Sequence, residues 1–126
     1  MPVLTKMVGF VNTTNPDAAK GFYRDKLGFR LLGDDDFAVV FDANGTMIRI
    51  SKAHSFTPAQ GTVLGWQVDD IDAAVGDLAS RGVTFEQFDL PFMKQDPSGI
   101  WTAPSGDRVA WFKDPDGNVL SVSQHV

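Results

Sequence analysis

Several residue types that carry particular chemistries are missing from this chain or scarce in it. The 126 residues include no cysteine, which excludes disulfides, a thiol nucleophile and a thiolate metal site and fits a reducing cytoplasm. Besides the aspartates, the side chains that commonly bind metals are only His54, His125 and a single glutamate, Glu86. Few side chains of this chain could therefore bind a metal ion or take part in redox chemistry.

Positive charge and long apolar runs are also limited. Lysine and arginine together number 11, they form no basic cluster, and the formal net charge is -5. Binding to nucleic acid or to an anionic membrane through charge is therefore not expected, and a small molecule or a protein is the favoured partner. No apolar run approaches the roughly 20 residues of a membrane span, and residues 1–11 lack the apolar core of a signal peptide. We expect a cytoplasmic protein.

The pattern that is present begins with one βαβββ unit. Hydrophobic residues make up 43% of the chain and charged residues 21%, as in ordinary globular domains. A strand is predicted over residues 6–13. A helix follows, capped by Asn15, with Pro16 at its first position and Gly28 at its end. The strands predicted after this helix cover residues 29–32, 37–41 and 46–51.

A second unit repeats the first after a linker at residues 54–61. A strand at residues 62–68 precedes a helix that Asp69 or Asp70 caps and Gly82 ends. Further strands are predicted to begin at residues 84–89 and to cover residues 100–103, 108–113 and 118–124. We therefore expect one domain of two modules, at about residues 1–53 and 62–126.

Two sequence offsets support an internal duplication. Ala18-Ala19 recurs as Ala73-Ala74, 55 residues later, whereas the turn and strand at residues 42–51 match residues 114–123, 72 residues later. The difference, 72 − 55 = 17 residues, is an insertion in the second module within about residues 90–106. The long segment 88–107 is either a lid over a cavity or an arm that contacts a second subunit.

Three groups of residues resemble one known superfamily, the vicinal oxygen chelate proteins. They are Phe22-Tyr23 with Leu27-Gly28-Phe29, the run from Val68 to Ala74 with Arg81-Gly82-Val83, and Phe112-Lys-Asp-Pro-Asp-Gly-Asn118. This superfamily includes glyoxalase I, extradiol dioxygenases, fosfomycin-resistance enzymes and bleomycin-resistance binding proteins. The resemblance implies an α+β fold in which two βαβββ modules form a curved eight-stranded mixed sheet around a cavity, within a homodimer. It does not imply one reaction.

Metal-dependent relatives carry their ligands on the first and last strands of each module. The resemblance places those positions at Val8, Arg49, Val63 and Ser121 of this sequence. Valine has no donor atom, arginine stays protonated, and a lone serine hydroxyl is a poor ligand. We therefore expect no metal and no cofactor at the usual site, although a displaced site stays open. We interpret His125, next to the last residue, as part of a frayed end rather than as a ligand.

The candidate ligand-binding residues lie on the strands that would face the cavity. Arg49 is the first, because a guanidinium can hold a carboxylate, a phosphonate or an enolate-like oxygen, and its alternative role is an ion pair with a nearby aspartate. Polar ligand atoms would be oriented by Asn12, Gln67, Ser121 and Ser123. Trp101, Trp111 and Phe10 are candidates for stacking on the ligand, with core packing as the alternative. The sequence indicates no Ser/His/Asp arrangement, P-loop or dinucleotide-binding glycine pattern.

These residues favour a metal-independent protein that binds a small molecule in a cavity with a fixed arginine. One alternative is an enzyme, either a lyase or isomerase that uses Arg49 as an electrophile or a dioxygenase-like protein with an atypical or displaced metal site. Another alternative is an interaction module without a ligand. In such a module, side chains would fill the cavity.

Overall fold

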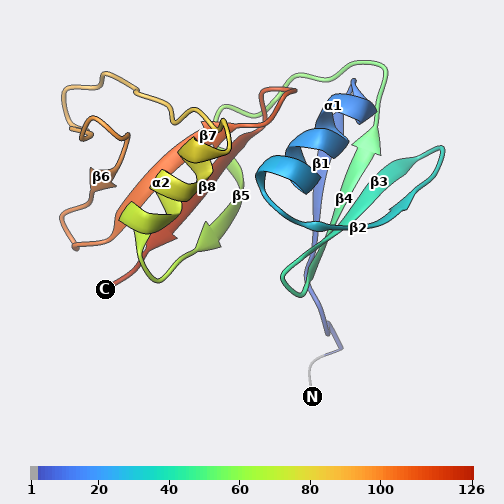
Figure 1. The fold of residues 1–126 in the computed structure, drawn as a ribbon, viewed down its shortest axis with the longest axis horizontal. Coiled ribbons are helices and arrows are strands. Elements are labelled where there is room, and N and C mark those ends of the chain that lie inside the picture. Colours follow the sequence, from blue (N-terminus) through green and yellow to red (C-terminus); the bar gives the residue numbers. More distant parts are fainter. Residues whose placement is uncertain (1–2) are drawn as a thin grey trace. The chain divides into compact units, whose positions relative to one another are not determined.

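The computed structural model describes residues 3–126, and the chain divides into two compact units, one that ends at Pro58 and one that begins at Ala59 (Figure 1). Each unit has one four-stranded sheet and follows the predicted βαβββ plan. Within residues 3–126, no helix is both long enough and apolar enough to cross a membrane.

The sheet of unit 1 mixes parallel and antiparallel pairs. Its strands are β1 (Val8–Thr13), β2 (Arg30–Asp34), β3 (Ala38–Ala43) and β4 (Thr46–Lys52), in the order β1-β4-β3-β2. β1 runs parallel to β4, and the other two pairs are antiparallel. The crossover from β1 is helical, with α1 (Pro16–Gly21) continued by a π-helical segment, η1 (Phe22–Lys26). The predicted helix is therefore confirmed, with a wider second half.

Local signals in the sequence explain where this helix starts and what it buries. The side chain of Asn15 accepts a hydrogen bond from the backbone N–H of Ala18 at 3.2 Å, so the predicted cap is confirmed. Tyr23 is fully buried, with its ring 5.3 Å from Phe22 and 6.0 Å from Phe41 between centroids. The helix covers one face of the sheet, and the opposite face, called the open face of unit 1, carries no helix of this unit.

Two of the acidic residues 34–36, Asp34 and Asp35, stabilise the turn between β2 and β3. Asp34 forms ion pairs with Lys20 and with Lys52, the second at 2.7 Å. Hydrogen bonds from these two lysines hold the pKa of Asp34 below its usual value. The carboxylate of Asp35 accepts hydrogen bonds from the backbone N–H groups of Phe37 and Ala38. The carboxylates of Asp34 and Asp35 therefore have structural partners within unit 1.

Unit 2 repeats the plan with a shorter edge strand. Its elements are β5 (Thr62–Gln67), α2 (Ile71–Ser80), β6 (Trp101–Thr102), β7 (Arg108–Lys113) and β8 (Val119–Gln124), and the strand order is β5-β8-β7-β6. Of the two predicted caps for α2, Asp70 is the one used, through the N–H of Ala73. α2 packs on one face of β7 and β8 (Figure 1), and the opposite face carries no helix of unit 2; this face is called the open face of unit 2.

The strand predicted from residue 84 is wrong. Phe85 alone makes a bridge, to Phe112, and the N–H of Glu86 donates to the carbonyl of Trp111 at 2.8 Å. The chain then leaves the sheet and returns at β6, where Trp101 pairs with Val109. The insertion therefore interrupts the edge strand of unit 2. The sequence did not reveal this, because residues 84–89 have the residue pattern of a strand even though they do not form one.

The inserted loop, residues 87–100, has its own hydrogen-bonded interior. The side chain of Gln95 donates to the carbonyls of Glu86 and Gly99 at 2.8 and 2.7 Å and accepts from the N–H of Phe88 at 2.8 Å. One carboxylate oxygen of Asp96 accepts from the N–H groups of Ser98 and Ile100. The loop thus follows a defined path that touches the sheet through a bridge between Gln95 and Trp101, and the lid and the contact arm both remain as interpretations.

The turn between β7 and β8 confirms the predicted hairpin. Asp114 is buried, with 5% of its surface exposed, and its Oδ1 accepts from the N–H groups of Asp116 and Asn118 at 2.9 and 3.0 Å. Its Oδ2 accepts from the side-chain amide of Asn118, which is also buried, at 2.8 Å. Gly117 has a φ of 86°, which favours glycine. One carboxylate therefore organises the whole turn.

Candidate ligand-binding site

The predicted site residues of unit 1 lie on the open face of its sheet. Burial alternates along β1 and β4, with Val11, Ile48 and Ile50 toward the helix, so Phe10, Asn12 and Arg49 point the other way. Phe10 and Arg49 are direct neighbours across the β1–β4 pair. Phe10 is 64% exposed and therefore does not belong to the core of unit 1.

Arg49 has no carboxylate partner among residues 3–126. The ion pairs of this region join other residues, and Arg49 acts on Asp35 only through its charge, without an ion pair. The pKa of Asp35 is lowered first by hydrogen bonds from the N–H groups of Phe37 and Ala38, and only to a smaller extent by the charge of Arg49. The alternative role of Arg49 as one half of an ion pair is thus not seen, and its guanidinium N–H groups are available to an anion.

The predicted site residues of unit 2 lie on the open face of the second sheet. Cross-strand pairing joins Gln67, Ser123, Val109 and Trp101 in one row and Gly65, Ser121 and Trp111 in the next. Leu120 and Val122, which alternate with the serines, are buried on the helix side. The sequence-based assignment of faces in β8 is therefore confirmed.

Aromatic rings form one continuous group on this face. The rings of Trp101 and Trp111 lie 6.1 Å apart between centroids with planes inclined by 34°. Phe88 of the inserted loop meets Trp111 edge to face at 5.4 Å. The indole N–H of Trp111 donates to Thr62 Oγ1 at 3.0 Å, which fixes the ring. Phe88 was missed because only the folded path of the loop brings it to the sheet.

Ser121 sits in a space that Gly65 leaves open. Ser121 is 8% exposed, and a Cβ atom built on Gly65 would lie 2.7 Å from Ser121 Oγ. We predict that Gly65→Ala lowers the free energy of unfolding by about 1–2 kcal/mol because the hydroxyl must leave its position. Denaturant unfolding of Gly65→Ala, Ser121→Ala and the double variant measures this. The double variant should recover most of the loss, and equal losses with and without the hydroxyl would contradict the steric account.

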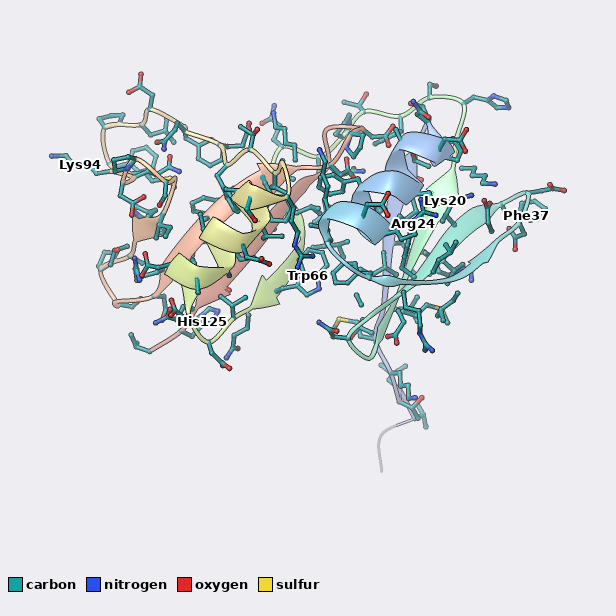
Figure 2. All side chains as sticks on the ribbon, viewed as in Figure 1. Lys20, Arg24, Phe37, Trp66, Lys94 and His125 are labelled. Carbon is teal, nitrogen blue, oxygen red and sulfur yellow. The ribbon has the colours of Figure 1, made fainter. Side chains whose placement is uncertain are left out.

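Ser123 contacts His125, which in turn contacts Asp107, and the sequence did not indicate either pair. Its Oγ lies 2.9 Å from His125 Nε2, and His125 Nδ1 lies 3.4 Å from Asp107 Oδ2. The expectation of no Ser/His/Asp arrangement is therefore wrong. His125, labelled in Figure 2 beyond the end of β8, is not frayed, because the N–H of Val126 donates to Asp107 Oδ1 at 2.9 Å. The register of β7 and β8 was the signal, since the pair Arg108–Gln124 makes Asp107 and His125 neighbours.

A hollow of about 530 Å³ lies elsewhere, within the inserted loop. It is lined by backbone and side chains from Gln87 to Gln95, and Lys94 extends from the same loop into solvent (Figure 2). None of the predicted site residues lines this hollow, so it does not support their assignment.

Comparison with known proteins identifies the family. The model of the Glyoxalase/Bleomycin resistance protein/Dioxygenase superfamily matches residues 5–122, nearly the whole chain. The chain belongs to this superfamily. The recognition made from the helix and turn motifs is confirmed, as is the fold of two βαβββ modules.

Solved structures of the superfamily include proteins of different function. An antibiotic binding protein, TnmS3 from Streptomyces sp. CB03234, is 26% identical with a TM-score of 0.70, over 100% of this chain and 99% of that one. Lactoylglutathione lyase from Agrobacterium tumefaciens is 21% identical with a TM-score of 0.69, over 98% and 94%. A superfamily member from Sphaerobacter thermophilus DSM 20745 is 23% identical with a TM-score of 0.74, over 98% of both chains. The comparison with curated proteins gives no match.

The residues of this superfamily member do not fit the usual metal of its relatives. On the open face of unit 1, Val8 is paired with Met47 and Arg49 with Phe10. In unit 2, Val63 lies at an irregularity between β5 and β8, and Ser121 faces Gly65. Within residues 3–126, no three histidine, aspartate or glutamate side chains gather as a metal site would require. A permanent cation at Arg49 would repel a metal ion rather than bind it.

Proposed function

We propose that this protein binds a small planar anion without a metal ion. The observation that carries the proposal is Arg49, a half-buried guanidinium on an open sheet face, beside an exposed phenyl ring and without an ion-pair partner in residues 3–126. A cation without a partner is suited to a carboxylate or phosphonate, and Phe10 can stack on the flat part of the same molecule.

The open face of unit 2 carries ligand-binding groups of its own. Trp101 and Trp111 supply apolar surface, while Gln67 and Ser123 supply hydrogen-bonding groups and Ser121 lies buried beside them. The similarity to an antibiotic binding protein also favours binding over turnover. A homodimer in the cytoplasm, as the resemblance and composition suggest, belongs to the same proposal.

The enzyme alternative uses the same arginine differently. In a lyase or isomerase, Arg49 would stabilise an oxyanion that forms during the reaction, so the bound compound would be converted. Recovery of the ligand unchanged distinguishes binding from this alternative.

The test is a matched panel of small aromatic compounds, namely 2-naphthoate, a naphthylphosphonate and the neutral 2-naphthamide. Binding is followed by tryptophan fluorescence and calorimetry, and the compounds are recovered and analysed by mass spectrometry. We expect the two anions to bind at least tenfold more tightly than the amide and to be recovered intact. Equal affinity for the amide, or no binding of any compound, would overturn the proposal. A converted compound would establish the enzyme alternative instead.

A further inference from the structure

We propose that Ser123 is a nucleophile for acyl groups, with His125 as its base and Asp107 as the residue that positions the imidazole. This goes beyond the proposed function, because binding an anion requires no covalent step. It depends on unit 2 alone and does not involve Arg49.

The three side chains have the connectivity that such a role requires. Ser123 Oγ is 2.9 Å from His125 Nε2, within the range for transfer of the hydroxyl proton. His125 Nδ1 is 3.4 Å from Asp107 Oδ2, a longer contact of the kind that tightens when substrate binds. With its proton on Nδ1, the ring faces Asp107 with its donor and Ser123 with its acceptor.

The backbone around this group explains why the imidazole is held in place. Asp107 comes directly before β7 and His125 directly after β8, and these strands are paired in register up to Arg108 and Gln124. The second oxygen of Asp107 accepts the N–H of Val126 at 2.9 Å, which ties down the residue that follows the histidine. Ser123 and His125 are two residues apart and so lie on one face of the extended chain.

The neighbours of Ser123 suit an acyl substrate. Gln67 is its direct partner on β5, and the Gln67 side chain makes no hydrogen bond to any residue in 3–126, so its amide N–H groups can donate to an oxyanion beside Ser123. Val109 is the partner on β7, and Trp101 follows on β6. These two side chains give an apolar surface for the acyl chain of a small ester.

The reaction is balanced with water as the only co-reactant. Ser123 Oγ bonds to the carbonyl carbon while its proton passes to His125 Nε2, and the ester C–O bond then breaks as this proton goes to the leaving alkoxide. Water attacks the acyl group on Ser123, with its proton taken by Nε2 and returned to Oγ as the acyl–oxygen bond breaks. The products are a carboxylic acid and an alcohol.

The experiment uses the intact protein with an alkyl fluorophosphonate, which phosphonylates an activated serine with loss of fluoride, and with 4-nitrophenyl acetate as substrate. Peptide mapping should place the label on Ser123, and Ser123→Ala should lose both labelling and esterase activity. His125→Gln should slow labelling at least tenfold. Ser80→Ala, which removes an exposed hydroxyl on α2, is the matched control and should leave both unchanged.

The variant Asp107→Asn distinguishes a role of Asp107 in orienting the imidazole of His125 from a purely structural role. The Asn side chain can still accept the N–H of Val126, but it presents an amide donor to the ring and favours the wrong tautomer. We expect the maximal labelling rate to fall while the probe concentration for half-maximal rate is unchanged. Label absent from Ser123, or equally fast labelling in folded His125→Gln, overturns the proposal. Because Arg49 is not involved, such a failure with intact binding of 2-naphthoate would leave the proposed function standing.

Discussion

Replacing Asp114 with alanine should lower the free energy of unfolding by about 3 kcal/mol, because buried donors in the β7–β8 turn would lose their acceptor. The carboxylate accepts from the N–H groups of Asp116 and Asn118 and from the side-chain amide of Asn118. Asp114 and Asn118 are 5% and 4% exposed, so water reaches the abandoned groups poorly. Chemical denaturation followed by tryptophan fluorescence measures the loss.

The first module supplies a matched control for this variant. Asp42 stands at the equivalent position of the repeat, 72 residues earlier, and its carboxylate accepts from the N–H of Gly45 at 2.7 Å in a more exposed turn. Asp42→Ala should therefore cost only about 1 kcal/mol. Equal losses in the two variants would show that burial does not govern the importance of this turn residue.

Replacing Arg49 with alanine should weaken binding of 2-naphthoate about 30-fold, which corresponds to about 2 kcal/mol. The alanine variant removes the charge and the paired N–H donors, and Arg49 has no ion pair within residues 3–126 whose loss would disturb the fold. Arg49→Lys should recover part of the affinity, since it restores charge without the planar fork. Calorimetry with 2-naphthoate and 2-naphthamide separates charge from ring contact.

An arginine in unit 2 controls for general charge effects. Arg81 lies just after α2 and forms an exposed ion pair with Asp77 at 3.3 Å, so Arg81→Ala should bind 2-naphthoate like the parent protein. If Arg49→Ala binds 2-naphthoate unchanged, Arg49 is not the anion site.

The fold could be predicted where local signals and the repeat agreed. Asn15, Asp70 and the turn at Asp114 each use short-range hydrogen bonds that a sequence encodes directly. The edge of unit 2 could not be predicted in the same way. The edge strand is interrupted after Glu86 and resumes at Trp101, and the loop between them is held by the hydrogen bonds of Gln95. The periodicity of apolar residues does not predict these hydrogen bonds.

The candidate site was partly predictable for a similar reason. Alternation along the strands assigned Arg49, Ser121 and Ser123 to the faces away from the helices, and strand pairing agrees with that assignment. Arg49 and Ser123 are half-buried there, whereas Ser121 is buried. The alternation could not predict which side chains from distant parts of the sequence contact one another. That Arg49 has no ion pair in residues 3–126 and that Asp107 meets His125 both follow from strand register and side-chain conformation.

Metal-independent binding at Arg49 is tested most directly by measuring metal content and anion affinity in the same preparation. The protein is analysed by inductively coupled plasma mass spectrometry, and 2-naphthoate is titrated by calorimetry before and after exhaustive dialysis against a chelator. We predict less than a stoichiometric amount of any divalent metal and the same dissociation constant in both titrations. One tightly bound metal ion per chain, with binding that disappears on chelation and returns when the metal is restored, would contradict this account.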